Sequence, residues 1–144
     1  MIEQDTVRLL RECDAGVKMG ISSIDDVMDT VRAEDMKTML SRCKAEHEKL
    51  DREIRDALNR FRDEGKDPNP MASFMSEMKT SMKLAMKESD ATIADLMTDG
   101  CNMGVKSLAK YLNKYKAADE ASKDITKRLI HLEEQLAIDL RPYL

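Results

Sequence analysis

The stretch CDAGVKMGISSI, residues 13–24, returns in altered form as TDGCNMGVKSL, residues 98–108. Each copy carries two glycines four residues apart, followed by a branched aliphatic residue and a serine. Glycine in a helix interior costs about 1 kcal/mol relative to alanine, yet both stretches otherwise have helical sequence. Because the chain has only five glycines, placing four of them in two matched pairs indicates an internal duplication.

The repeat extends beyond the glycine pairs. Met19 to Ile24 aligns with Met103 to Leu108 at an offset of 84 residues. A weaker match aligns Glu48 to Leu58 with Glu134 to Leu144 at an offset of 86. Together the two matches predict a duplicated helical hairpin of about sixty residues.

Apolar residues at helical spacing predict four long helices. In the first helix the apolar seam skips Asp14, and in the second helix His47 takes an apolar position. Pro142 is expected to end the last helix. The four predicted spans are about Gln4 to Arg32, Glu34 to Glu64, Ser89 to Lys116 and Glu120 to Arg141.

A long connector separates the two predicted hairpins, which cover about residues 4–64 and 88–144. It begins with GKDPNP, residues 65–70, the chain's only Gly/Pro/Asn cluster. Loops in bundles need only about 2–8 residues, whereas residues 65–87 are numerous enough to run the length of a long helix. We therefore expect a single all-α, four-helix domain of two antiparallel αα-hairpins joined by a long, partly helical crossover.

Composition excludes several classes of function. Charged residues make up 36% of the chain and the net charge is −4, with both signs interspersed and no basic stripe or aromatic platform for nucleic acid. No apolar run approaches the roughly 18 residues of a membrane span, and the N-terminus has no apolar signal segment. The three cysteines Cys13, Cys43 and Cys101 fit reduced core thiols of a cytoplasmic protein.

Over nearly the whole chain this arrangement resembles the ferritin-like superfamily, and the resemblance implies a bacterial protein. Many members bind two iron or manganese ions through Glu-x-x-His motifs. Here the residue three before His47 is Lys44, and the residue three before His131 is Arg128. Because a cation at a ligand position opposes binding of a divalent metal, the resemblance implies the fold but not the usual di-iron chemistry.

A degenerate metal site is the first candidate site. The repeat aligns His47 with Glu133, and a two-fold relation between the hairpins would bring His47, Glu46 and Glu133 together. Asp14 and Asp99 would add further carboxylates. One histidine with two or three carboxylates suits iron, manganese or zinc. The alternative is a hydrogen-bonded His–Glu pair inside the bundle, with the remaining acids facing water.

A stripe of methionines is the second candidate site. It comprises Met71, Met75, Met78, Met82 and Met86, which step by 4, 3, 4 and 4 residues. Thioethers bind Cu(I), but the same spacing is what an amphipathic helix needs for packing. We expect the stripe to contact the bundle, a second copy of the chain in a homo-oligomer such as a homodimer, or another protein partner.

Gly16 and Gly20 are expected to form a smooth strip on the first helix, and Gly100 and Gly104 on the third. The strips would pack against each other or receive larger residues from the other two helices, which favours a packed centre. No nucleophile–base pair, phosphate loop or dinucleotide motif is present. The leading hypothesis is a non-catalytic structural or interaction protein without a cofactor, and the alternative is an oxidase or storage protein holding Fe or Mn.

Overall fold

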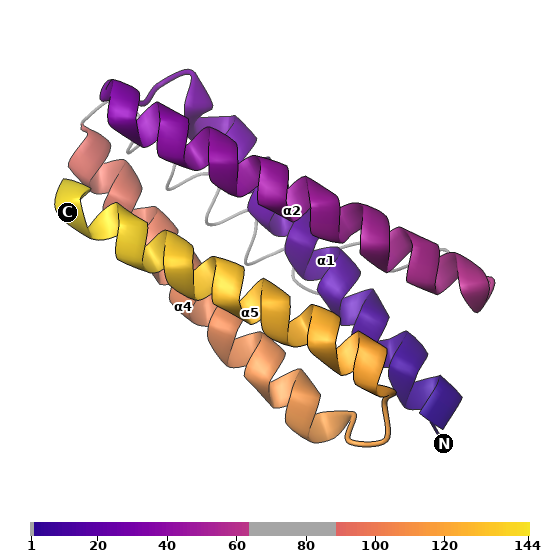
Figure 1. The fold of residues 1–144 in the computed structure, drawn as a ribbon. Helices are drawn as coiled ribbons and strands as arrows, with labels where there is room; N and C mark the ends of the chain where they lie inside the picture. Colours follow the sequence, from indigo (N-terminus) through magenta and orange to yellow (C-terminus); the bar gives the residue numbers. More distant parts are fainter. Residues whose placement is uncertain (1, 64–88) are drawn as a thin grey trace.

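The computed structural model describes residues 2–63 and 89–144, and these residues form an all-α, four-helix bundle without strands (Figure 1). The expected crossover, about 65–87, and the methionine stripe lie outside the described residues. The described elements are the helices α1 (Ile2–Met28), α2 (Glu34–Arg60), α4 (Asp90–Lys114) and α5 (Glu120–Leu140), followed by the short 3-10 helix η2 (Arg141–Tyr143).

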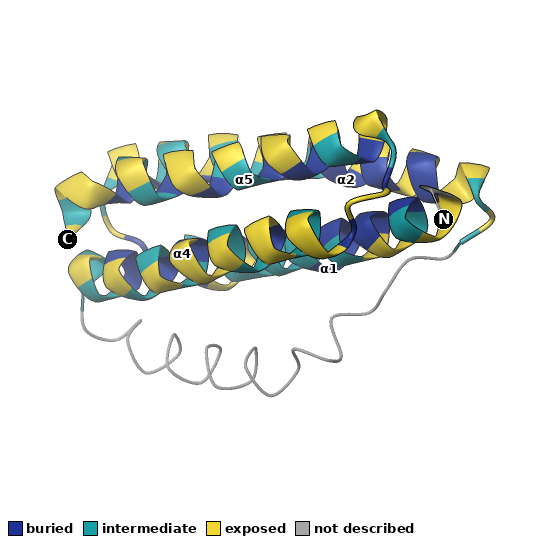
Figure 2. Cartoon of the chain, turned by 90° about the horizontal axis from the view of Figure 1, so that it is seen from below, coloured by how far each residue is buried: buried dark blue, intermediate teal, exposed yellow. Residues whose placement is uncertain are grey.

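The helices are arranged as two antiparallel hairpins, α1 with α2 and α4 with α5 (Figure 1). Helices α1 and α4 form one layer and α2 and α5 the other, and each helix turns its buried face toward the interior (Figure 2). Helix α4 begins beside the turn between α1 and α2, at the opposite end of the bundle from the end of α2. The second hairpin therefore lies antiparallel to the first, as expected.

Most helix ends lie close to their predicted positions, because local capping residues define them. The Ser89 hydroxyl accepts a hydrogen bond from the backbone N–H of Thr92 at 3.2 Å at the start of α4, and the Asp119 carboxylate does the same for Ser122 at 2.8 Å in α5. The predicted ends of the first and second helices were each four residues too late, since α2 ends at Arg60 rather than Glu64. Helix α1 ends at Met28, and Val31 then folds into the core, where it is 2% exposed.

Reciprocal side-chain caps join the two hairpins at both ends of the bundle. At one end the Asp90 carboxylate accepts hydrogen bonds from the backbone N–H groups of Arg32 and Ala33, at 2.8 and 2.9 Å. At the other end the Asp5 carboxylate accepts a bond of 3.1 Å from the backbone N–H of Ala117. Because Asp5 and Ala117 stand 85 residues from Asp90 and Arg32 respectively, the duplication predicted from the glycines is also visible in these contacts.

A layer centred on a histidine and a glutamate divides the apolar core into two clusters. Each helix contributes one residue to this layer: Gly20 on α1, His47 on α2, Gly104 on α4 and Glu133 on α5. The cluster nearer the turn between α1 and α2 contains Ile24, Val27, Val31, Met36, Leu40, Ile93, Ala94, Met97, Cys101, Leu136 and Leu140. The opposite cluster contains Leu10, Cys13, Val17, Leu50, Ile54, Ala57, Leu58, Leu108, Ile125 and Leu129.

Candidate functional site

A histidine and a glutamate meet at the centre of the bundle. His47 is fully buried, and Glu133 is 9% exposed. The Nδ1 atom of His47 donates to the backbone carbonyl of Cys43 at 2.8 Å, one turn earlier on α2. The Nε2 atom lies 3.0 Å from Oε1 of Glu133. Both ring nitrogens of His47 therefore have protein partners.

Opposing effects set the charge of this histidine. Burial by itself lowers the pKa of His47, because a charged ring is costly in an apolar interior. The hydrogen bonds to the side chains of Cys43 and Glu133, together with the negative charge of Glu133, outweigh that effect and raise the pKa of His47 to about 10. At neutral pH the pair is thus an imidazolium facing a carboxylate.

The central glycines make room for the pair. A Cβ on Gly20 would lie 2.7 Å from the Cδ2 and Nε2 atoms of His47, closer than real carbon contacts. A Cβ on Gly104 would lie 3.6 Å from Oε2 of Glu133, an ordinary contact. Of the two expected arrangements, the structure has the one in which the glycines receive larger residues from the other helices.

The five candidate metal ligands do not converge. Glu46 is exposed and its carboxylate is 3.1 Å from the Lys49 ammonium, because consecutive residues point about 100° apart on a helix. Asp99 is also exposed. Asp14 is 1% exposed and 2.8 Å from the Lys18 ammonium. Only His47 and Glu133 meet, and residues 2–63 and 89–144 contain no group of three His, Cys, Asp or Glu placed to hold a metal ion.

Two thiols accompany the central pair. The Sγ atom of Cys43 lies 3.5 Å from Nδ1 of His47. Because Cys43 precedes His47 by four residues on the same helix, the sequence spacing could have predicted this contact. Burial, reinforced by Glu133, raises the pKa of the Cys101 thiol far above its ordinary value. Burial likewise raises the pKa of Cys13 to about 12. Cys13 and Cys101 therefore stay protonated at neutral pH and are poor nucleophiles.

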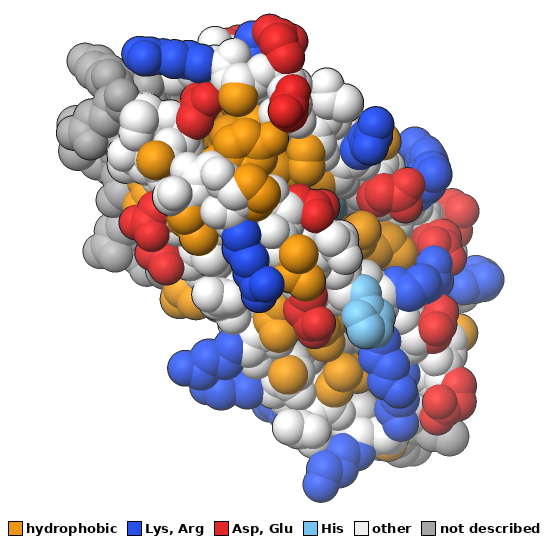
Figure 3. All heavy atoms as spheres, turned by 60° about the vertical axis from the view of Figure 1, so that its left-hand side comes forward, with side chains coloured by type: hydrophobic (Ala, Val, Ile, Leu, Met, Phe, Trp, Pro, Cys, Tyr) orange, Lys and Arg blue, Asp and Glu red, His pale blue; other side chains and the backbone are white. Residues whose placement is uncertain are grey.

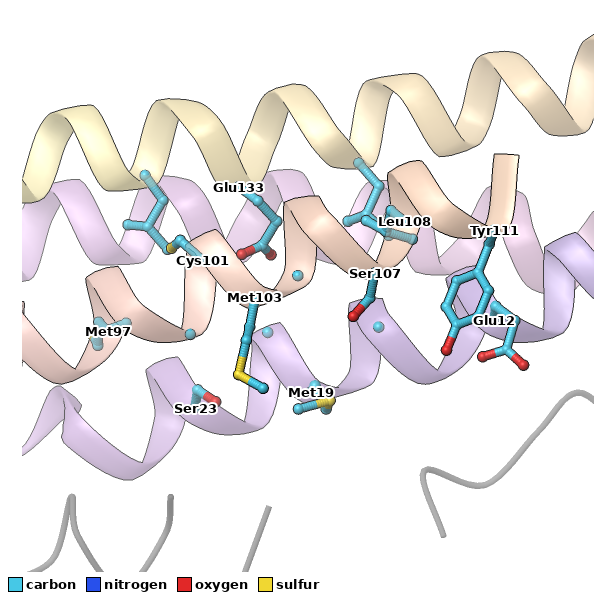
Figure 4. Close-up of a pocket in the computed structure, with 16 residues that line it drawn as sticks. Glu12, Met19, Ser23, Met97, Cys101, Met103, Ser107, Leu108, Tyr111 and Glu133 are labelled. Atoms are coloured by element: carbon cyan, nitrogen blue, oxygen red, sulfur yellow. The ribbon is translucent and has the colours of Figure 1, made fainter. Parts of the chain in front are cut away.

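A pocket of about 90 Å³ lies between α1 and α4 (Figure 4). Its sides are matched residues of the duplication, each pair 84 positions apart, and α5 contributes the floor. The glycine strips thus line a pocket, and of the two arrangements left open for them the structure does not have one strip packed on the other. The matched pairs are Gly16 and Gly100, Met19 and Met103, Gly20 and Gly104, and Ser23 and Ser107; the floor residues are Leu129, Glu133 and Leu136.

Charged groups are confined to the floor and one end of this pocket. Glu133 reaches into it from α5, and Glu12 lies beside the ring of Tyr111 at the end (Figure 4). Met19 and Met103 extend from facing helices on the outer side (Figure 4), and Met103 is 42% exposed. The pocket is therefore an apolar recess whose outer side consists of flexible thioether side chains.

One face of the molecule carries side chains of both charges. On the face shown in Figure 3, acidic and basic side chains are interspersed around apolar atoms. Among the described residues, no helix combines the length and apolar character needed to cross a bilayer.

Fold and site together define an all-α, four-helix bundle with a buried His–Glu pair at its centre. The chain belongs to the family described as a domain of unknown function (DUF2383), which it matches over residues 5–114. The matched region contains most of α1 and all of α2 and α4, and ends before α5. No curated protein and no solved structure matches the chain.

Proposed function

We propose that this protein is a non-catalytic structural or interaction protein with a ferritin-like architecture, whose centre is closed by packing. The supporting observation is the hydrogen bonding of His47. Its Nδ1 atom bonds a backbone carbonyl at 2.8 Å and its Nε2 atom a carboxylate oxygen at 3.0 Å. With both nitrogens protonated, the ring has no lone pair to offer a metal.

The surroundings of the pair support the same conclusion. Iron and manganese sites of this architecture use several carboxylates, whereas Glu133 is the only one of the four candidate carboxylates beside His47. A metal would have to displace the Nε2 proton and break the bond to Glu133. Because the raised pKa of His47 opposes that deprotonation, metal binding would be disfavoured at neutral pH.

The alternative is a metal-dependent oxidase or storage protein holding Fe or Mn, and one observation favours it. A histidine whose Nδ1 donates to a backbone carbonyl is oriented as metal-ligating histidines are, with Nε2 directed at the metal. In this chain Nε2 and the Glu133 carboxylate would be the first two ligands. The same experiment separates the two functions.

The test is metal analysis of protein purified without a histidine tag and incubated with Fe(II) or Mn(II). The chain has two histidines, His47 in the core and the exposed His131, so His131→Ala is a matched control for His47→Ala. We expect far less than one metal ion per chain in all three proteins. Near-stoichiometric metal that is lost in His47→Ala and kept in His131→Ala would establish the alternative.

We also propose that the protein is cytoplasmic and a homodimer. The three cysteines are free, which supports a reducing compartment. Two large apolar side chains near the C-terminus, Ile138 and Leu144, are 45% and 58% exposed, and they offer surface for self-association. Sedimentation equilibrium of the full chain tests the dimer, and Ile138→Lys should shift it to the monomer mass.

A further inference from the structure

The outer face of α5 carries an exposed apolar side chain between two unlike charges. Ile138 is 45% exposed, with the exposed Glu134 four residues before it and the exposed Arg141 three residues after it. The backbone of Arg141 is still helical, with φ −52° and ψ −42°. At about 100° per residue the three side chains therefore fall within about 60° of one another around the helix axis. Together they form one surface, which we call the α5 stripe.

Neither charge of the α5 stripe has an intramolecular partner within residues 2–63 and 89–144. The Glu134 carboxylate and the Arg141 guanidinium make no ion pair or side-chain hydrogen bond there. Their neighbours Gln135 and Asp139, by contrast, bond each other at 2.8 Å. An apolar centre with a polar rim is the arrangement found in protein interfaces, so the stripe has the composition of a contact surface.

The other copy of the repeat lacks these features on the matching face of α2. The aligned positions, 86 residues apart, are Glu48 with Glu134, Arg52 with Ile138, and Arg55 with Arg141. The centre of the α2 face is therefore charged. Both flanking charges are also already paired, because the Glu48 carboxylate lies 3.8 Å from the Lys44 ammonium and the Arg55 guanidinium 2.7 Å from the Asp51 carboxylate. Of the two copies, the one on α5 has the apolar centre and the free charges.

We propose that the α5 stripe is the contact between two copies of the chain, with their α5 helices antiparallel about a two-fold axis at Ile138. This inference rests on the proposed homodimer and adds the face and the orientation of its interface. Ile138 then meets the partner subunit's Ile138. Glu134 lies about 6 Å along the helix from Ile138 and Arg141 about 4.5 Å in the other direction, so Glu134 faces the partner subunit's Arg141. The two-fold axis forms this ion pair twice.

Charge distinguishes the antiparallel from the parallel orientation. A parallel pair of α5 helices would bring the two Glu134 carboxylates together and the two Arg141 guanidinium groups together. Like charges placed opposite each other in an interface weaken association, whereas complementary charges fix its register. The order of charges along the stripe therefore favours the antiparallel pair.

Sedimentation equilibrium of charge-reversed variants tests the contact. The stripe carries only positive charges in Glu134→Arg and only negative charges in Arg141→Glu. Each variant alone opposes like charges twice, so we expect its dimer dissociation constant to rise by about tenfold or more. An equimolar mixture of the two variants opposes unlike charges twice, and we expect it to form a heterodimer with an affinity close to that of the wild-type dimer.

Arg52→Glu is the matched control, because it reverses a charge at the aligned exposed position of α2. We expect it to leave the dissociation constant unchanged, and circular dichroism to show equal helix content in all the variants. A wild-type protein that stays monomeric would overturn both the homodimer and this contact. A wild-type dimer that both single reversals leave intact would overturn this contact alone, and failure of the mixture to dimerise would overturn the antiparallel orientation.

Discussion

His47 and Glu133 set the electrostatics at the centre of the bundle. Removing one partner of a buried ion pair leaves the other charge uncompensated, which typically costs about 3–5 kcal/mol. Replacing both partners by apolar groups of similar volume can instead be nearly neutral. The pair therefore specifies how the two hairpins meet, because each hairpin supplies one charge.

The pair makes the free energy of unfolding fall as the pH rises. The pKa of His47 is raised from 6.5 to about 10 on folding, so its contribution is complete below pH 6.5 and is lost as pH rises toward 10. From pH 6 to 8 we expect the free energy of unfolding to fall by up to about 2 kcal/mol, measured by urea titration. The thiols of Cys13 and Cys101 do not contribute in this window. Their pKa values are raised on folding, so they also lower the free energy of unfolding as pH rises, but only at the higher pH where thiols of the unfolded chain ionise.

Glu133→Gln is the control for this pH effect. Without the carboxylate the imidazolium has no partner, and the pKa of His47 should return toward its ordinary value. The slope of stability against pH between 6 and 8 should then flatten. An unchanged slope in Glu133→Gln would show that another group is responsible.

Gly20 and Gly104 are equivalent positions of the repeat, yet replacing them by alanine should change the stability of the protein in opposite directions. The new Cβ at position 20 would lie 2.7 Å from the His47 ring, which is held by two hydrogen bonds, so Gly20→Ala should destabilise by about 1–3 kcal/mol. At position 104 the contact is 3.6 Å, and the gain in helix propensity should make Gly104→Ala neutral or stabilising by up to about 1 kcal/mol. Thermal unfolding of both variants tests the contrast, and equal shifts would contradict it.

At the scale of the element, the end of α2 is strained. Arg62 has a φ of 55°, in the left-handed region that favours glycine. The backbone N–H groups of Arg62 and Asp63 donate to the carbonyls of Asn59 and Leu58, both at 3.0 Å. This is the Schellman motif, with arginine where glycine is usual.

Arg62→Gly should therefore stabilise the protein by about 1 kcal/mol. Arg60→Gly, two residues earlier within α2 and also exposed, should destabilise it by a similar amount, because glycine there weakens the helix. Urea unfolding of the two variants at one pH gives the comparison. If both variants lose stability, the strain at Arg62 is compensated by its side chain.

At the scale of the whole molecule, the duplication predicted most of what the structure contains. Residue offsets in the repeat aligned His47 with Glu133, and the length of the connector predicted antiparallel hairpins. The features that the repeat did not predict depend on contacts between residues distant in the sequence. The caps from Asp5 and Asp90 join residues far apart in sequence, and the pocket between α1 and α4 is completed by Leu129 and Leu136 of α5.

The two copies of the repeat differ at the centre of the bundle, with histidine in the first hairpin and glutamate in the second, and this difference predicts which hairpins associate. A pair of first hairpins would bury two His47 rings without an acidic partner, and a pair of second hairpins would oppose two Glu133 carboxylates, whereas the native combination joins opposite charges. Like charges placed together in a buried interface cost several kcal/mol. Fragments 2–63 and 89–144 should therefore associate as a 1:1 complex in preference to either homodimer.

Sedimentation velocity and circular dichroism of the separate and mixed fragments measure this preference. We expect helix content to rise on mixing, and His47→Glu in the first fragment to abolish the rise, because it would oppose two carboxylates. His131→Glu in the second fragment, at an exposed position, should leave association unchanged. Homodimers as stable as the mixed complex would mean that the apolar clusters alone determine pairing. A preference for the mixed complex would mean that the two halves of the bundle are complementary because one central residue is His in one hairpin and Glu in the other.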